Sequence, residues 1–314
     1  VRAEDRKSLV ALARRHHALP VAIAFDMPEE VCLARNAARS DRSIPKRVVG
    51  DHVRLLRRSL RGLEREGFRG VHILRSEAGV AEATVLREPL WCDRRGEHGP
   101  FDIIGDVHGC RDELDALLGR LGYRATASNG APAHPEGRRA IFVGDLVDRG
   151  PDSPGVLRRV MDMVAAGSAL AVPGNHDLKL VKKLAGRDVK VAHGLAETLA
   201  QLEALPDETR KLFCDEARRF LDDLVSHLWL DDGKLVVAHA GMKEDMQGRG
   251  SGAVRSFALY GETTGEIDEY GLPVRLNWAA EYRGRAMVVY GHTPTPVAEW
   301  VNSTICIDTG CAFG

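Results

Sequence analysis

Five short apolar segments, each followed at once by a glycine-led polar motif, restrict the fold of this chain most strongly. They read FDIIGD, AIFVGD, ALAVPGN, LVVAHAG and MVVYGH, and they lie between Phe101 and His292. Short apolar runs bounded by turn residues are typical of buried strands. Loops that follow the strands of a rigid sheet often carry catalytic side chains. The pattern therefore predicts a layered α/β domain whose site is built from five strand ends.

The polar residues at these strand ends are of the types that bind divalent metal ions. Asp106 and His108 lie two positions apart, so their side chains point the same way on an extended strand end. Imidazoles and carboxylates that converge from separate loops form mixed nitrogen and oxygen metal sites. The other candidate ligands are Asp145, Asn175, His239 and His292. One such residue alone would indicate only a turn, but the ordered set predicts a metal site.

The set GDVHG, GDLVDRG, GNHD, VVAHAG and YGHT resembles the calcineurin-like metallophosphoesterases over about residues 101–314. The resemblance implies an α/β (α+β sandwich) fold of two packed β-sheets flanked by helices, with two divalent metals at the sheets' edge. It implies that the first metal is held by Asp106, His108 and Asp145, and that the second is held by Asp145, Asn175, His239 and His292. We expect Mn²⁺, although Ni²⁺, Fe²⁺ and Zn²⁺ also accept these ligands.

A hydrolytic mechanism follows from such a centre. Two divalent ions acidify a shared water, so a metal-bridging hydroxide attacks phosphorus without a protein nucleophile. We expect His176 to protonate the leaving oxygen and Asp148 to orient its imidazole. Arg149 is expected to clamp the phosphate oxygens, because the guanidinium fork suits them. Asp308 is either a turn residue or the hydrogen-bond partner of a ligand histidine, on the strand after His292.

The first 90 residues predict a separate α/β segment. An apolar strand spans residues 20–26, a helix is predicted from Lys46 to Glu66 with Gly67 after it, and another strand begins at Gly70. This order resembles the closing part of a P-loop polynucleotide kinase. Arg35 and Arg39 share one helix face and resemble lid arginines that bind the phosphate donor, although a solvated arginine face explains them as well.

The remainder of the organisation is predicted from composition. Residues 91–100 are polar and read as a linker. The six cysteines are scattered, which favours reduced thiols, and no apolar run is long enough for a membrane helix, so we expect a cytoplasmic protein. The absence of G-x-x-x-x-G-K-[ST] predicts that this chain has no kinase activity. The ending DTGCAFG, where a closing strand is expected, predicts a phosphoesterase domain truncated at its carboxyl end.

A kinase-like front, with the stretch GRGSGAVRSFALYGETTG, resembles the bacterial polynucleotide kinase-phosphatases of RNA repair. The resemblance implies removal of 2′,3′-cyclic, 2′- or 3′-phosphates from RNA ends, with Arg255 as a contact to phosphate or RNA. It also implies an RNA 3′-end methyltransferase partner; the family's ligase module is absent here.

Three alternatives remain open. A symmetrical dinucleoside tetraphosphate hydrolase is favoured by IDTGCAFG, which resembles the ending of that subfamily and would give nucleotide phosphoesters as substrates. A serine/threonine protein phosphatase of the same superfamily is the second. A non-catalytic scaffold is the third, but such proteins usually lose ligands, and here every expected ligand is present.

Overall fold

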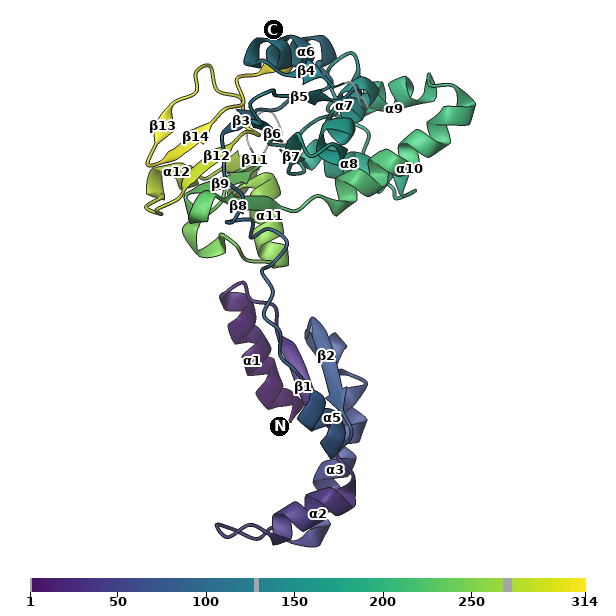
Figure 1. The fold of residues 1–314 in the computed structure, drawn as a ribbon, viewed down its shortest axis with the longest axis vertical. Coiled ribbons are helices and arrows are strands. Elements are labelled where there is room, and N and C mark those ends of the chain that lie inside the picture. Colours follow the sequence, from purple (N-terminus) through teal and green to yellow (C-terminus); the bar gives the residue numbers. More distant parts are fainter. Residues whose placement is uncertain (1, 127–129, 268–272) are drawn as a thin grey trace. The chain divides into compact units, whose positions relative to one another are not determined.

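A computed structural model of the chain describes residues 2–126, 130–267 and 273–314 (Figure 1). The chain divides into two compact units, Val1–Glu88 and Pro89–Gly314. No helix among the described residues is long and apolar enough to cross a membrane.

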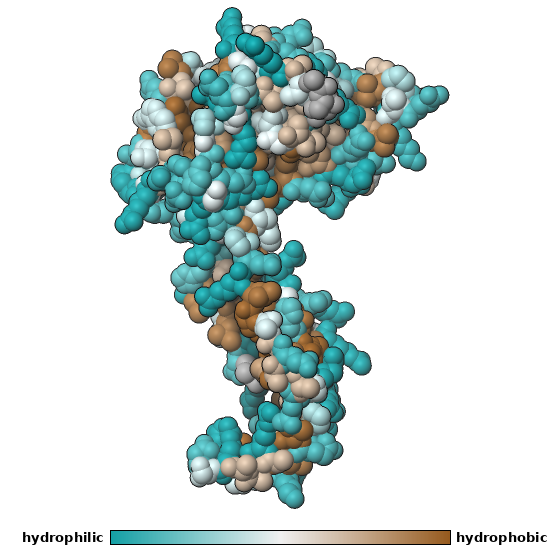
Figure 2. Space-filling view, in the orientation of Figure 1, coloured by the Kyte–Doolittle hydropathy of each residue, from teal (hydrophilic) through white to brown (hydrophobic). Residues whose placement is uncertain are grey.

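The first unit contains a two-stranded parallel sheet and five helices. Strand β1 (Val21–Phe25) pairs in parallel with β2 (Gly70–Leu74). The helices are α1 (Ala3–Arg15), α2 (Glu29–Ala37), α3 (Lys46–Leu60), α4 (Leu63–Glu66) and α5 (Glu77–Glu82). Hydrophobic side chains are visible among hydrophilic ones on the surface of this unit (Figure 2). Alternate residues of β1 are exposed, namely Val21, Ile23 and Phe25.

The helix predicted from Lys46 to Glu66 is broken in the structure. Helix α3 ends at Leu60, and α4 begins only at Leu63, after Gly62. Glycine is costly inside a helix because its backbone loses the most conformational freedom on ordering. The prediction of one continuous helix was therefore wrong, whereas Gly67 ends α4 with a left-handed φ of 108°, as expected.

The second unit contains two larger sheets. One has the order β3-β6-β7 and is parallel throughout. Its strands are β3 (Phe101–Ile104), β6 (Arg139–Phe142) and β7 (Ala169–Ala171). The other has the order β13-β14-β12-β9-β8, in which β9, β12 and β14 are parallel. Its strands are β8 (His227–Leu230), β9 (Leu235–Ala238), β12 (Met287–Tyr290), β13 (Trp300–Val301) and β14 (Thr304–Cys306).

The period of two along each strand explains how these sheets pack. Ile141 in β6 belongs to a buried cluster with Leu228 and Val237 of the other sheet. Its neighbours Ala140 and Phe142 point the opposite way and belong to a cluster shared with helices. The two sheets therefore pack face to face, and helices cover their outer faces, which confirms the predicted α/β sandwich.

The helices form two groups on the outer faces. Those that share the core of the three-stranded sheet are α6 (Arg111–Leu121), α7 (Ser153–Ala165), α8 (Asn175–Leu184), α9 (Leu195–Glu203) and α10 (Asp207–Asp223). Those that pack on the five-stranded sheet are α11 (Gly252–Tyr260) and α12 (Trp278–Glu281). The short elements are β4 (Arg124–Ala125), β5 (Pro132–Ala133), β10 (Thr263–Ile267), β11 (Pro273–Arg275) and 3₁₀ turns at Asp231–Gly233, Glu244–Met246 and Cys311–Phe313.

The segment predicted as a linker, residues 91–100, is hydrogen-bonded to strand β8 of the second unit. Trp229 in β8 donates its backbone N–H to the carbonyl of Cys92, and Arg94 donates to the carbonyl of Trp229, both at 2.9 Å. Cys92 is fully buried, and the guanidinium of Arg95 lies 4.3 Å from the centre of the Trp229 ring. Part of this segment is thus a short strand-like extension beside β8.

The buried carboxylate of Asp102 makes the stability of the second unit depend on pH. Asp102 accepts hydrogen bonds from Tyr123 Oη at 3.0 Å and from Arg138, and the Arg138 guanidinium lowers the pKa of this carboxyl. A carboxylate whose pKa is lowered by folding stabilises the protein above its unfolded pKa of about 4, and this stabilisation is lost as pH falls further. We expect Arg138→Gln to lower the Tm at pH 7, with a smaller difference at pH 3.

Thermal unfolding at the two pH values measures the effect. Arg124→Gln, which changes an exposed arginine that follows Tyr123 in the sequence, is the matched control. An equal loss of Tm at both pH values would show that Arg138 acts by packing and not through the charge of Asp102.

Candidate metal centre

The candidate ligands converge because parallel strands end at the same edge of a sheet. Asp106 follows β3, Asp145 follows β6, and Asn175 follows β7 as the first residue of α8. His239 follows β9 and His292 follows β12, which are parallel neighbours in the other sheet. Two packed sheets therefore bring five separate loops to one place.

Asp145 lies at the centre of the cluster. The potential ligand atoms of His108, Asp145 and His176 lie within 4.8 Å of one another, and so do those of Asp145, His239 and His292. Asp145 Oδ2 is 3.7 Å from His108 Nε2 and 3.4 Å from His239 Nε2. One carboxylate thus belongs to both groups, which is the arrangement that a bridging ligand requires.

The remaining predicted ligands extend these groups. Asn175 Oδ1 and His292 Nδ1 each lie 3.0 Å from His239 Nε2. The Asp106 carboxylate accepts the backbone N–H of His292 at 3.1 Å. The structure therefore brings all six predicted ligand residues together at one edge of the two sheets.

The chemistry of this donor set fits divalent cations. Burial lowers the pKa of His239 and of His292, so both imidazoles are neutral and offer a lone pair. His292 Nε2 is buried and has no hydrogen-bond partner among the described residues. His108 and His239 each donate Nδ1–H to a backbone carbonyl, at 2.9 and 3.0 Å, so Nε2 is the nitrogen of each ring that carries the lone pair for a metal.

Strained backbone is concentrated in these loops. Five residues that the sequence singled out have left-handed φ values, namely His108 (45°), Asp145 (48°), Asp148 (73°), Arg149 (69°) and His292 (74°). Such conformations are uncommon for residues with a side chain, and they persist where surrounding structure imposes them. The motif glycines meet the same constraint: a Cβ on Gly144 would lie only 2.3 Å from the backbone nitrogen of Gly174.

His176 and Asp148 form a buried hydrogen-bonded pair beside the cluster. His176 Nδ1 lies 2.6 Å from Asp148 Oδ2, and Thr198 Oγ1 donates to Asp148 Oδ1 at 2.7 Å. Burial acts to lower the pKa of His176, but the hydrogen bond to Asp148 and the charge of Asp145 outweigh it and raise this pKa. The ring stands edge-on to His108, with centroids 5.0 Å apart.

Arg149 and Asp308 also lie at this edge, and Asp308 is in a turn, which was one of its two expected roles. Arg149 is exposed, its Nη1 is 2.9 Å from His108 Nε2, and its guanidinium lies 5.1 Å from the Phe313 ring. Asp308 follows β14 instead of lying within it, and its carboxylate accepts the backbone N–H of Gly310 at 3.0 Å. No hydrogen bond joins Asp308 to a histidine ring in the described part of the chain.

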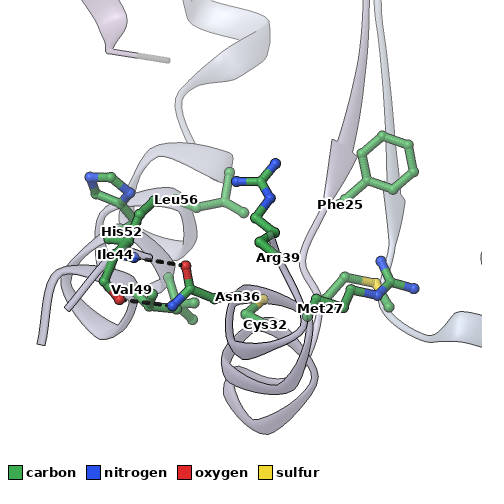
Figure 3. Close-up of a pocket in the computed structure, with 11 residues that line it drawn as sticks. Phe25, Met27, Cys32, Asn36, Arg39, Ile44, Val49, His52 and Leu56 are labelled. Carbon is green, nitrogen blue, oxygen red and sulfur yellow. Dashed lines mark hydrogen bonds between the residues drawn. The ribbon is translucent and has the colours of Figure 1, made fainter. Parts of the chain in front are cut away.

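The other predicted phosphate contacts are outside these loops. Arg255 lines a groove with residues of α8 and α10. Arg35 and Arg39 belong to the first unit, where they line a cavity of about 470 Å³ with Phe25 and other mainly apolar residues (Figure 3). Arg35 pairs with Glu77 at 2.7 Å. Their binding of a phosphate donor stays a prediction.

Sequence reasoning missed three residues near the centre. Asp177 is fully buried and accepts the backbone N–H groups of Leu146 and Gly174, so it ties two metal-site loops together. Its position three residues after Gly174, in the first turn of α8, is a capping signal that the sequence contains. Thr198 and Arg275 are distant in sequence from every motif, and no local pattern marks them.

Arg275 lies in a pocket that adjoins the centre. The pocket has a volume of about 330 Å³ and is also lined by His292, Tyr260 and Trp278. Arg275 Nη1 donates to Thr293 Oγ1 at 2.6 Å, and burial lowers the pKa of this guanidinium. Among the ion pairs described for the chain, none involves Arg275.

Comparison with known proteins finds a family match in each unit. The calcineurin-like phosphoesterase family matches residues 99–296, and an AAA domain family matches residues 1–63. An asymmetrical bis(5′-nucleosyl)-tetraphosphatase PrpE from Bacillus subtilis is 48% identical over 214 residues, which cover 68% of this chain and 87% of that protein. The protein of the same name from Anoxybacillus flavithermus is 46% identical and is covered over 86% of its length.

These relatives correct the expected function. RNA end healing was inferred from a resemblance to polynucleotide kinase-phosphatases, but relatives that match most of the second unit are named as tetraphosphatases. The RNA reading was wrong, and nothing supports RNA ends or a methyltransferase as partners. The alternative, a dinucleoside polyphosphate hydrolase, agrees with the relatives, except that they are of the asymmetrical type.

Fold, donor set and relatives agree on the family and its chemistry. Metallophosphoesterases act on phosphoesters at a binuclear divalent metal centre, and this chain has candidate residues for such a centre. The match to the family covers well over half of the chain. The chain therefore belongs to the calcineurin-like phosphoesterase family and is a hydrolase of phosphoesters.

Proposed function

We propose that this chain hydrolyses dinucleoside tetraphosphates into unequal products, a nucleoside triphosphate and a nucleoside monophosphate. The observation that carries the proposal is the identity of 46–48% to asymmetrical tetraphosphatases across 86–87% of their length. The pocket beside His292 supports it, because it is a partly aromatic space next to the candidate metal ligands, of the kind that accepts a nucleoside.

The centre is proposed to hold two divalent cations. Asp106, His108 and Asp145 would bind one, and Asp145, Asn175, His239 and His292 the other. Two such cations supply Lewis acidity and neutralise charge on the phosphate oxygens. Mn²⁺ is the proposed ion, since the donors are three neutral imidazoles and three oxygen-bearing side chains, a set that Ni²⁺, Fe²⁺ and Zn²⁺ share.

His176 is proposed as the general acid. Its Nδ1 is held by Asp148, which fixes the ring and leaves Nε2 to carry the proton towards the leaving oxygen. Thr198 donates to Asp148 and is a positioning residue. The pKa of His176 is raised, and a raised pKa favours the protonated form that a general acid needs.

Two arginines are proposed to bind phosphate oxygens. Arg149 is exposed beside His108, so its guanidinium can turn from the ring nitrogen to an anionic substrate. Arg275, which is exposed and lines the pocket with His292, has no described carboxylate partner and is available to a phosphate. Planar guanidinium groups suit bidentate contacts to phosphate.

A substrate panel tests the reaction. With Mn²⁺ present, we expect diadenosine tetraphosphate to yield ATP and AMP, because the relatives are asymmetrical enzymes. Chromatography of the nucleotides measures the products, and a phosphopeptide serves as the comparison substrate. Two equivalents of ADP would show a symmetrical cut, and hydrolysis of the phosphopeptide alone would contradict the proposal.

Metal analysis tests the shared ligand. We expect Asp145→Asn to lose most of the roughly two bound ions, because Asp145 belongs to both groups, whereas Asp106→Asn loses about one. Metal content per chain after loading with Mn²⁺ and desalting measures the difference. Equal metal content in the two variants would refute the assignment of Asp145 as the bridging ligand.

Leaving-group dependence tests His176. We expect His176→Ala to keep its metal and to lose about 10²- to 10⁴-fold in kcat on alkyl phosphate esters, which need protonation of the leaving oxygen. The loss on p-nitrophenyl esters should be much smaller, because that leaving group departs without a proton. Steady-state kinetics across such a series measures the slope, and an equal loss on all esters would exclude the role.

A further inference from the structure

A second surface near the metal centre has features of an anion site. A groove of about 410 Å³, which we call the basic groove, lies between α8, α10 and α11. Four cationic side chains line it: Lys182 from α8, Arg187 from the loop after α8, Arg218 from α10 and Arg255 from α11. One carboxylate, Asp222, lines it as well. Cationic side chains in the lining therefore outnumber anionic ones by four to one.

These cations are not neutralised by the protein. In the described part of the chain, no ion pair or side-chain hydrogen bond involves any of the four charged groups. Like charges held close together repel one another, and the repulsion is relieved when a polyanion enters. A surface that gathers unpaired cations on three separate elements is thus suited to a ligand with several phosphates.

The apolar part of the basic groove suits the base of a nucleotide. Leu178, Val181 and Leu259 are buried apolar residues of the lining, and Tyr260 at its end is 42% exposed. Apolar and aromatic surfaces accept a base, and an exposed tyrosine ring can stack on one. The lining therefore combines an apolar floor with a cationic rim.

Two elements connect the basic groove with the metal centre. Helix α8 begins at Asn175, a proposed ligand, and Leu178 lies one turn further on, about 5 Å along the helix axis. Tyr260 lines both the basic groove and the pocket that holds His292 and Arg275. The basic groove and the metal centre therefore share helix α8, and Tyr260 borders both the groove and the pocket beside His292.

We propose that the basic groove binds the nucleoside triphosphate arm of the substrate, an inference that rests on the proposed asymmetrical cleavage. An unequal cut of a tetraphosphate leaves three phosphates on one arm and one on the other. The triphosphate arm carries most of the negative charge, so it needs cations beyond the reacting phosphate. The four unpaired cations meet that need, and the single-phosphate arm is left to the pocket beside His292.

The experiment compares substrates with and without a polyphosphate arm. The test variant is Lys182→Gln combined with Arg218→Gln, and the substrates are diadenosine tetraphosphate and the p-nitrophenyl ester of thymidine 5′-monophosphate. We expect the ratio of the two KM values to rise about 10- to 100-fold, because charge-assisted contacts to phosphate are lost. Inhibition by ATP as a product should weaken in parallel.

The matched control is Lys183→Gln combined with Arg219→Gln, which removes the neighbouring cations that do not line the groove. This control should leave the KM ratio unchanged, and thermal unfolding checks that both double variants are folded. If the wild-type chain cleaves the tetraphosphate but the test variant keeps the same KM ratio, the role of the groove is refuted.

Two further outcomes separate the possibilities. A wild-type chain that cleaves the thymidine ester but not the tetraphosphate would contradict the proposed function itself, and the triphosphate arm with it. If ATP changes hydrolysis of the thymidine ester without competing with it, and does so only when Lys182 and Arg218 are present, the groove binds a free nucleotide as an effector. That result would overturn its assignment to a substrate arm.

Discussion

The concentration of buried negative charge at one sheet edge is the constraint on which this structure depends. Asp106, Asp145, Asp177 and Asp308 are all almost completely buried. Burial and the neighbouring charge of Asp145 raise the pKa of Asp106, and the same causes raise the pKa of Asp177 to about 7. Buried like charges are costly unless compensated. Burial acts to raise the pKa of Asp145 too, but the neighbouring histidines lower it to about 2, and divalent cations held by Asp106 and Asp145 would compensate the charge further.

Short strands and rigid turns hold these buried side chains in place. Parallel strands deliver each loop to the same edge, and close contacts such as Gly144 against Gly174 lock neighbouring loops together. Asp177 adds hydrogen bonds from one loop to the next. Left-handed conformations at His108, Asp145 and His292 then persist because the surroundings leave no alternative. The residues that hold the geometry are therefore distinct from those that face the substrate.

The sequence was informative where the signal was local. Apolar runs ending in glycine predicted the strands and which residues gather at their ends, because strand alternation and parallel pairing are sufficient for that inference. Arg275 and Thr198 were not predicted, because only tertiary packing brings them near the centre. The substrate was misjudged for a different reason: RNA was inferred from the first unit and from the stretch GRGSGAVRSFALYGETTG, whereas nothing in the metal loops distinguishes RNA from other phosphoesters. The break at Gly62 was a local signal that the helical periodicity around it obscured.

The strand-like extension at Cys92 to Glu97 is part of the folded second unit, although it precedes the first strand of the larger sheets. β8 is the outer strand of its sheet, and backbone groups of this extension occupy its free side at Trp229, Asp231 and Asp232. The family match starts only at residue 99. A chain cut there would keep every candidate ligand yet expose an unpaired strand edge, which invites pairing between molecules. The extension thus covers a sheet edge and carries none of the candidate ligands, so edge protection and metal binding belong to different stretches of the same unit.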